Sequence, residues 1–215
     1  MLVVVGGHSR NVGKTSVVCG IIRALRECNW TAIKITRYGH GVCSRNGEPC
    51  PCADPVHPVA VSREEGHLPA TDSGRFLEAG AARAYWVRTP DGGLGEAMPR
   101  VRELIEQAEN TIIESNSVLR FLKPDFCAMV VDGAVADFKP TSLRFLDRAD
   151  ALVLTSPADL VWPEVPQSLL RSRPRVTAFP YYESPELIER LKSLPMPPPL
   201  DRVAFINSAP RESEA

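Results

Sequence analysis

The sequence predicts an α/β fold in which a mostly parallel sheet carries helices on both faces. Apolar runs of strand length, such as Val3–Val5 and Phe126–Val131, alternate along the chain with segments of helical periodicity, such as Val17–Leu25. This alternation is typical of parallel strands joined by crossover helices, which cover the sheet from two sides. The length of 215 residues suits one domain of this class.

Taken in order, the patterns place each element of that fold. Strands are expected at residues 3–5, 31–36, 83–89, 110–114, 126–131, 151–155, 175–179 and 203–206. Helices are expected at residues 17–25, 71–81, 94–109, 141–149 and 184–194. We expect a single domain over residues 1–208, with an irregular Cys-, Pro- and Gly-rich insertion at 38–70 and a disordered tail at 209–215.

The segment between the first strand and the first helix has the layout of a phosphate-binding loop. Gly13-Lys14-Thr15 follows an apolar strand and opens an amphipathic helix, which is the context that the motif requires. Backbone N–H groups in such a loop converge on phosphate oxygens. The candidate nucleotide-binding residues are Gly7, His8, Ser9, Arg10, Asn11, Val12, Gly13, Lys14, Thr15 and Ser16.

Three of these residues have distinct expected roles. Gly13 lets the backbone approach a phosphate closely, and Lys14 would reach the β and γ phosphates. The hydroxyl of Thr15 is a hard oxygen ligand that suits Mg²⁺. The common motif has glycine where this chain has His8, so that a loop counted from Gly7 is one residue longer. The motif and its context predict a phosphate-loop nucleotide-binding fold.

Charged residues in or just after expected strands are further candidates. Lys34 either lies on an edge strand and extends to water, or points at a nucleotide or substrate from the carboxyl end of its strand. Glu114 and Asp132 each follow an apolar run, and either one could supply the carboxylate that positions Mg²⁺ or could cap a following helix.

Half of the six cysteines cluster in the 38–70 insertion. Cys43, Cys50 and Cys52, with His40 or His57 as a nitrogen ligand, suit Zn²⁺ or an iron–sulfur cluster; the alternative is reduced thiols in an exposed loop. Cys19, Cys28 and Cys127 fall in helix or strand patterns and are expected to be buried small hydrophobic residues.

Bulk properties exclude some classes of partner. The net charge of −1 gives no basic surplus for nucleic acid. No apolar run reaches the roughly 18 residues of a membrane span, and glycines interrupt the first apolar run too early for a signal peptide. We therefore expect a cytoplasmic protein that binds neither nucleic acid nor membrane.

At three places the chain resembles the molybdopterin-guanine dinucleotide biosynthesis adaptor (MobB-like) family of GTP-binding proteins. These places are Gly13-Lys14-Thr15, Ile33-Lys34 and Asp72-Ser73-x-Arg75-x-x-Glu78-Ala79-Gly80-Ala81. The resemblance covers about the first 115 residues, in the order of a nucleotide-binding α/β unit. It implies that Glu114, rather than Asp132, is the acid near the metal, and that functional partners include a protein of cofactor biosynthesis and a second copy of the chain. The longer loop is closer to that of dethiobiotin synthetase and cobyrinic acid synthases.

The leading hypothesis is a GTP- or ATP-dependent, Mg²⁺-requiring nucleoside triphosphatase that acts in cofactor or metallocentre assembly. Lys14 would stabilise charge between the β and γ phosphates, Thr15 and Glu114 would serve the metal, and Asp72 would bind the metal or position a water. Two alternatives are an ATP-dependent ligase or carboxylase that uses Lys34, and a non-catalytic metal-binding adaptor. The choice between guanine and adenine is open because the chain has no Asn-Lys-x-Asp signature.

Overall fold

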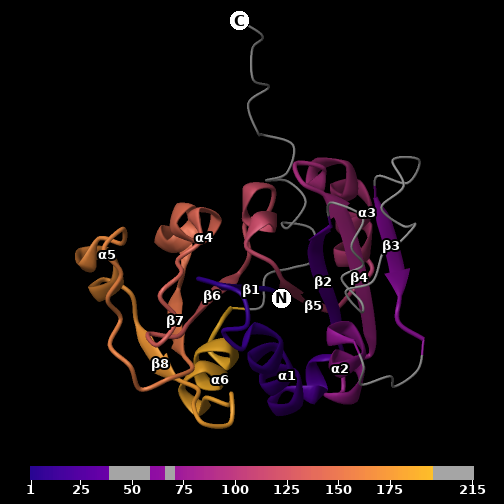
Figure 1. Cartoon of the computed structure of the whole chain (residues 1–215). Coiled ribbons are helices and arrows are strands. Elements are labelled where there is room, and N and C mark those ends of the chain that lie inside the picture. Colours follow the sequence, from indigo (N-terminus) through magenta and orange to yellow (C-terminus); the bar gives the residue numbers. More distant parts are fainter. Residues whose placement is uncertain (39–58, 66–70, 196–215) are drawn as a thin grey trace, which may run out of the picture.

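The described strands form one eight-stranded sheet with the order β3-β4-β2-β5-β1-β6-β7-β8. The computed structural model describes residues 1–38, 59–65 and 71–195 (Figure 1). All neighbouring strands are parallel except β3 and β4. The strands are β1 (Leu2–Gly7), β2 (Trp30–Tyr38), β3 (Ala60–Arg63), β4 (Arg83–Pro90), β5 (Asn110–Glu114), β6 (Phe126–Val131), β7 (Ala151–Leu154) and β8 (Arg175–Thr177). The predicted α/β fold is therefore confirmed.

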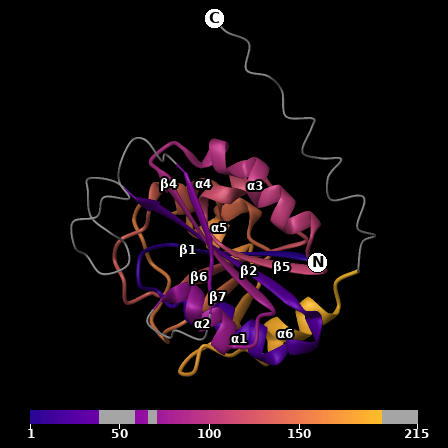
Figure 2. The same cartoon turned by 90° about the vertical axis from the view of Figure 1, so that its right-hand side faces the viewer.

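Helices lie on both faces of this sheet, as Figure 2 shows most clearly. The α-helices are α1 (Lys14–Ala24), α2 (Asp72–Glu78), α3 (Leu94–Glu106), α4 (Pro140–Phe145), α5 (Gln167–Arg171) and α6 (Pro185–Lys192). Short 3₁₀ segments are η1 (Arg26–Cys28), η3 (Ser117–Arg120) and η4 (Leu146–Arg148). Helices α1, α2 and α6 cover one face, and α3, α4 and α5 lie on the other (Figure 2).

Apolar side chains fill the space between the sheet and each helical layer. Ile21 of α1, Phe76 of α2 and Leu187 of α6 belong to one buried cluster with Val5 of the central strand β1. On the opposite face α3 contributes Met98 to a second cluster, and a third cluster packs around β7. Because both faces of the central strands β1 and β6 are covered, these two strands carry apolar residues and glycines throughout rather than alternating with polar ones, as the sequence patterns indicated. None of the described helices is long and apolar enough to cross a membrane.

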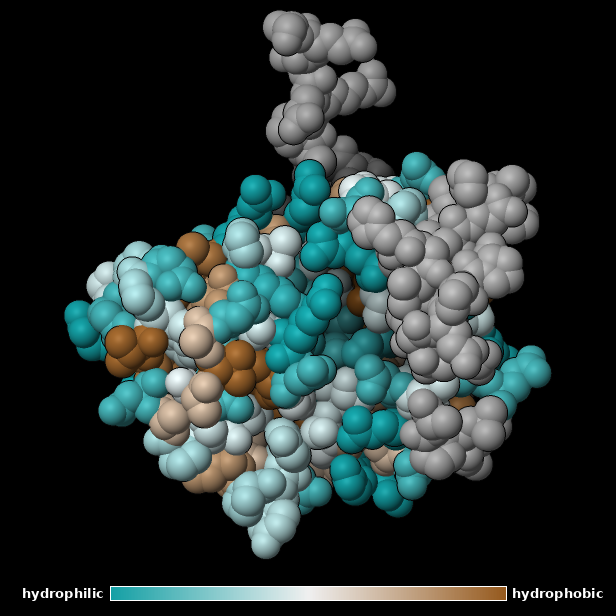
Figure 3. Space-filling model, viewed as in Figure 1, coloured by the Kyte–Doolittle hydropathy of each residue, from teal (hydrophilic) through white to brown (hydrophobic). Residues whose placement is uncertain are grey.

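The face drawn in Figure 3 is mostly hydrophilic across its middle, with hydrophobic residues gathered toward the side of α5. Among the described residues, the large hydrophobic side chains that are exposed are Val161, Tyr181 and Tyr182. The apolar content of the chain is therefore largely used inside the two helical layers.

Two elements differ from the sequence expectation. Part of the 38–70 insertion, expected to be irregular, forms the strand β3, which pairs antiparallel with β4 at the sheet edge. Val59 and Val61 pack against the second apolar cluster, and this burial stabilises the pairing of the short segment with β4. The short helix α5 was not predicted, because its five residues give too little periodicity to detect. The expected strand at 203–206 lies outside the described residues.

Helix α2 begins with a side-chain cap. The hydroxyl of Thr71 accepts a hydrogen bond from the backbone N–H of Gly74, at 2.9 Å. At the other end Gly80 adopts a left-handed backbone with φ of 110°, which allows the chain to turn into β4. These two features confirm the expected start and stop of this helix, and they fix the position of Asp72 in its first turn.

Replacing Thr71 with Ala should lower the free energy of unfolding by about 0.5–2 kcal/mol, because the first turn of α2 loses its cap. Thermal or denaturant unfolding measures the change. Thr71→Ser is the matched control, since it retains the capping hydroxyl. Equal losses in Thr71→Ala and Thr71→Ser would mean that the methyl group, not the cap, stabilises this site.

Candidate functional site

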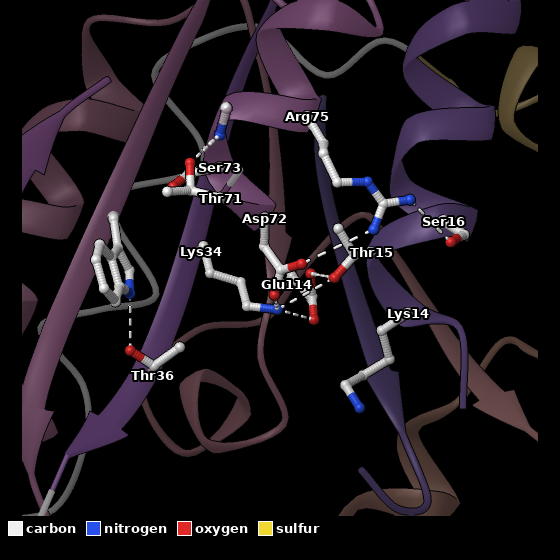
Figure 4. Close-up of polar contacts among 12 residues, drawn as sticks. Lys14, Thr15, Ser16, Lys34, Thr36, Thr71, Asp72, Ser73, Arg75 and Glu114 are labelled. Carbon is white, nitrogen blue, oxygen red and sulfur yellow. Dashed lines mark hydrogen bonds and ion pairs between the residues drawn. The ribbon is translucent and has the colours of Figure 1, made fainter. Parts of the chain in front are cut away.

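The polar residues predicted from the sequence gather where the carboxyl ends of β1, β2 and β5 meet the first turns of α1 and α2 (Figure 4). These three strands are parallel neighbours, so that their carboxyl ends share one edge of the sheet. Open α/β sheets bind their ligands at this edge. The fold therefore places the candidate site where ligand binding is expected for its class.

Asn116 anchors the start of the loop between β1 and α1. Its Oδ1 accepts from the backbone N–H of Gly7, and its Nδ2 donates to the carbonyl of Gly7, both at 2.8 Å. The hydroxyl of Ser142 also donates to that carbonyl, at 2.7 Å. Sequence reasoning assigned no role to Asn116 or Ser142. The available signal was that Asn116 follows Glu114 closely at the end of β5.

Two further contacts hold the middle and the end of the loop. The Ser9 hydroxyl donates to Asp137 Oδ2 at 2.6 Å, and the Thr155 hydroxyl donates to the carbonyl of Val12 at 3.0 Å. Asp137 follows β6, and Thr155 follows β7. The loop is thus attached to three strand ends before any ligand arrives, which reduces the entropy that binding would otherwise lose.

His8 has its backbone groups turned away from the centre of the loop. Its N–H donates to the carbonyl of Val130 at 3.0 Å, and its own carbonyl accepts from the N–H of Lys139 at 2.9 Å. These bonds leave the backbone of His8 no free group for a phosphate. Its proposed contact with a nucleotide is therefore the least supported of the loop assignments.

The His8 ring packs as a core side chain. It is fully buried and lies with its centroid 5.3 Å from that of Phe138 and 4.8 Å from that of Trp162. Its Nε2 lies 3.3 Å from the carbonyl of Val135. Burial lowers the pKa of His8 below its ordinary value, because the charged imidazolium would lose its hydration. His8 is a neutral packing residue in the position where the common motif has glycine.

Gly13 occupies a position that a side chain could not tolerate. Its φ of 90° lies in the left-handed region, and a Cβ built on it would lie 2.3 Å from Cε1 of Tyr182. Asn11 is also left-handed, with φ of 57°. The neighbouring Arg10 is exposed, as is Asn11. The close contact at Gly13 is with the ring of Tyr182, and its approach to a phosphate stays a prediction.

Lys14 folds back over its own loop. Its Nζ donates to the carbonyl of Ser9 at 2.7 Å. Burial lowers the pKa of Lys14 to about 8, since the ammonium loses water and gains only partial compensation from nearby carboxylates such as Glu114. An anion placed in the loop would restore that compensation. An anion bound in the loop would therefore favour the charged form of Lys14.

The predicted residues Thr15, Lys34, Asp72 and Glu114 form one cluster (Figure 4). Thr15 Oγ1 donates to Glu114 Oε2 at 2.8 Å. The Lys34 ammonium donates to Thr15 Oγ1 at 3.2 Å and to Glu114 Oε1, and it pairs with Asp72 Oδ2 at 3.0 Å. Four elements, α1, β2, α2 and β5, each contribute one member of this cluster.

Strand register explains why the buried members meet. Lys34 and Glu114 are direct partners across the β2 and β5 ladder, so their side chains leave the sheet on the same face. Strand β2 lies between β4 and β5, so the alternative that placed Lys34 on an edge strand is wrong. The side chain of Glu114 is only 3% exposed, and a carboxylate buried to this degree requires a close cation and hydrogen bonds.

Arg75 joins the rim of the cluster. Its guanidinium donates to the hydroxyl of Ser16 at 3.1 Å and lies 3.8 Å from Asp72 Oδ1. Sequence reasoning noticed Arg75 only as part of a family motif. Its contact with Ser16 connects the first turn of α2 to the first turn of α1.

Asp132 is not part of this cluster. Its Oδ1 accepts from the backbone N–H of Ala134 at 3.0 Å and so caps its own turn after β6. Of the two acids that the sequence left open, only Glu114 touches Thr15. The geometry favours Glu114 as the acid of this site.

The cluster fits a magnesium ion by its chemistry. A threonine hydroxyl and two carboxylates, those of Thr15, Asp72 and Glu114, are the hard oxygen donors that Mg²⁺ prefers. Within the described ranges, no group of three His, Cys, Asp or Glu side chains is arranged to hold a metal ion. An ion here would therefore depend on the hydroxyl and on ligand oxygens as well as on the two acids.

The cysteines divide into two sets. Cys43, Cys50, Cys52 and the histidines His40 and His57 lie outside the described residues, so the expected Zn²⁺ or iron–sulfur site stays a prediction. Among the rest, Cys19 and Cys127 are buried as expected, and Cys28 is half-buried. Burial raises the pKa of Cys127 to about 12 and that of Cys19 to about 11, which makes both thiols unreactive.

Comparisons with known proteins leave the family open. No family model matches the sequence, and no curated protein matches it. Among solved structures the chain is similar to LpxK from Aquifex aeolicus, described as an apo form in complex with ATP, with 19% identity and a TM-score of 0.44. The alignment covers 82% of this chain and 53% of that one, so the chain spans about half the length of LpxK. The resemblance to the adaptor family is not confirmed by these comparisons.

The burial of His8 generates a prediction about pH. Because its folded pKa lies below the ordinary 6.5, the unfolded chain binds a proton more readily, and stability should fall as pH decreases below about 6.5. His8→Phe keeps an aromatic ring but cannot be protonated. The wild type should therefore lose stability relative to His8→Phe between about pH 7.5 and pH 5, in denaturant titrations at each pH.

Phe138→Leu is the control for this measurement, because it disturbs the same aromatic cluster without a titratable group. Its difference from wild type should not change with pH. A constant difference between wild type and His8→Phe across the range would show that His8 remains able to take up a proton in the folded protein.

Proposed function

We propose that the chain binds a nucleoside triphosphate, GTP or ATP, together with Mg²⁺ and hydrolyses it. The observation that carries this proposal is the hydrogen bond from Thr15 to the buried Glu114. Thr15 directly follows Lys14 in the first turn of α1. A loop lysine, a helix-starting hydroxyl and a strand-end carboxylate are the three parts that phosphate-loop nucleotidases use around their metal.

The backbone of the loop and the start of α1 would hold the phosphates. Helix α1 begins at Lys14, and its unpaired N–H groups and positive dipole end favour an anion in the loop. Lys14 would exchange the carbonyl of Ser9 for phosphate oxygen. Gly7, Ser9 and Val12 of the loop are already held by residues that follow β5, β6 and β7.

The metal side of the site would be formed by Thr15, Glu114 and Asp72. When bound, Mg²⁺ supplies positive charge that offsets the charge of the triphosphate. Glu114 is buried and would hold a fixed position, whereas Asp72 is half exposed, with 49% of its side chain accessible. That exposure suits Asp72 to orient a water at the phosphate, since a water can reach it from solvent.

The biological role belongs to the proposal too. The motif from Asp72 to Ala81 and the lysine pair Lys14 and Lys34 support a role like that of the molybdopterin-guanine dinucleotide adaptor family, in cofactor or metallocentre assembly. Such a role includes a partner protein of cofactor biosynthesis, a homodimer and a cytoplasmic location.

An ATP-dependent ligase or carboxylase is the second candidate. The observation that favours it is the Lys34 ammonium, which adds a second cation next to the loop lysine and suits an anionic substrate. Phosphate release that needs no second substrate would favour the nucleotidase. Release that depends on an added carboxylic acid or amine would favour the ligase.

Replacing Lys14 with Ala should remove stabilisation by nucleotide. In the wild type, ATP or GTP with Mg²⁺ at 100 times the dissociation constant should add about 2.7 kcal/mol to the free energy of unfolding. A thermal-shift titration with each nucleotide measures this and also identifies the base. The control is Lys192→Ala, a half-exposed lysine on α6. A full shift in Lys14→Ala would disprove the loop as the phosphate site.

Replacing Glu114 with Gln should reduce Mg²⁺-dependent phosphate release by roughly 10–100-fold, while nucleotide binding changes less. The amide keeps the shape of the side chain but loses its charge. The matched variant is Asp132→Asn, which should retain activity because Asp132 only caps its own turn. Loss of activity in Asp132→Asn with normal activity in Glu114→Gln would transfer the role to Asp132.

A further inference from the structure

The oxygens that fit a magnesium ion are already occupied by a positive group of the protein itself. The Lys34 ammonium lies 3.2 Å from Thr15 Oγ1 and 3.0 Å from Asp72 Oδ2, and it also contacts Glu114 Oε1 (Figure 4). Its side chain is only 12% exposed, so it is held inside the cluster rather than extended to water. Lysine ammonium groups have three N–H donors, and these three oxygens provide an acceptor for each.

We propose that Lys34 acts as a built-in competitor of Mg²⁺, which fills the cation site of the empty protein and leaves it when Mg²⁺ arrives with the nucleotide. This inference rests on the proposed function for the identity of the incoming ligand. The proposed role of Lys34 is to occupy the cation site before Mg²⁺ and nucleotide bind, and it does not require a catalytic step.

Charge requires the two cations to exclude each other. The two carboxylates, Asp72 and Glu114, together carry two negative charges, which Mg²⁺ alone would neutralise, whereas Mg²⁺ together with the Lys34 ammonium would leave a net positive charge. A divalent ion that shared these oxygens would lie within a few ångströms of the ammonium, and like charges this close in a half-buried site repel strongly. The hydrogen bonds of Thr15 point to the same conclusion, because its hydroxyl already donates to Glu114 and accepts from Lys34.

The exchange makes Mg²⁺ and nucleotide depend on each other. Mg²⁺ alone must displace an ammonium from a buried carboxylate and leave that ammonium without a partner, which disfavours binding. A bound triphosphate offers new oxygens to the displaced ammonium, so that the ion and the nucleotide bind more readily together than separately. The empty protein is also stabilised, because Glu114 is never left without a cation.

A metal titration without nucleotide tests the competition directly. The probe is Mn²⁺, which accepts the same oxygen ligands and is followed by electron paramagnetic resonance. Lys34→Met should bind Mn²⁺ at least about tenfold more tightly than wild type, because the competing ammonium is gone. The added substitution Glu114→Gln should abolish that gain. Because no nucleotide is present, this result is independent of whether the proposed function is correct.

Arg75→Gln is the matched control. It removes a positive charge next to Asp72, 3.8 Å away, but its guanidinium does not touch Thr15 or Glu114. Mn²⁺ affinity should change much less in Arg75→Gln than in Lys34→Met. If both variants gained the same affinity for Mn²⁺, the gain would come from the loss of any nearby positive charge, and the inference would be overturned. Equal Mn²⁺ affinities of Lys34→Met and wild type would also overturn it.

Lys34→Met also deprives Glu114 of its cation, so the melting temperature with and without Mn²⁺ is measured as a second readout, which serves even where the variant is unfolded without the ion. The inference requires Mn²⁺ to raise the melting temperature of Lys34→Met more than that of wild type. A variant that stays unfolded at all Mn²⁺ concentrations would contradict it, because the ion would have failed to replace the ammonium. Failure of ATP and GTP to stabilise wild type would instead disprove the proposed function alone.

Discussion

A buried carboxylate sets the main constraint on this structure. Glu114 ends a strand in the middle of the sheet, and its side chain is almost entirely removed from water. A charge in such a place is tolerated only with a cation and hydrogen bonds around it. The chain supplies Lys34 from the adjacent strand and Thr15 from the start of α1. The need to neutralise one group thus fixes how two strands and a helix meet.

The same constraint reaches the loop and α2. Thr15 can meet Glu114 only if α1 starts where it does, and that start depends on the left-handed Gly13 and on the anchoring of Gly7 by Asn116. Asp72 reaches Lys34 because the Thr71 cap fixes the first turn of α2. Local backbone chemistry and the electrostatics of the cluster therefore support the same arrangement, which is the condition for a well-defined site.

Sequence patterns predicted the parts of the molecule that follow periodicity and short motifs. The long apolar strands and the turn of Gly13-Lys14-Thr15 needed only neighbouring residues. Contacts between segments that are distant in the sequence could not be predicted from such local patterns. The pairing of Lys34 with Glu114 depends on strand order, and Asn116 acts through a loop 109 positions away. His8 looked like a loop residue because the motif gives no sign that Phe138 and Trp162 bury its ring.

The two lysines of the site are both bound to protein oxygens in this structure, and this restricts which ligands can bind. Lys14 is held by the carbonyl of Ser9, and Lys34 is held by Thr15, Asp72 and Glu114, so both ammonium groups are bound to protein oxygen. A ligand must offer each of them something better than the oxygen it leaves. A single phosphate could satisfy Lys14, whose partner is a neutral carbonyl. Releasing Lys34 requires another cation to pair with the carboxylates of Asp72 and Glu114, and it requires an anion to pair with the freed ammonium. A metal-bound polyphosphate provides both.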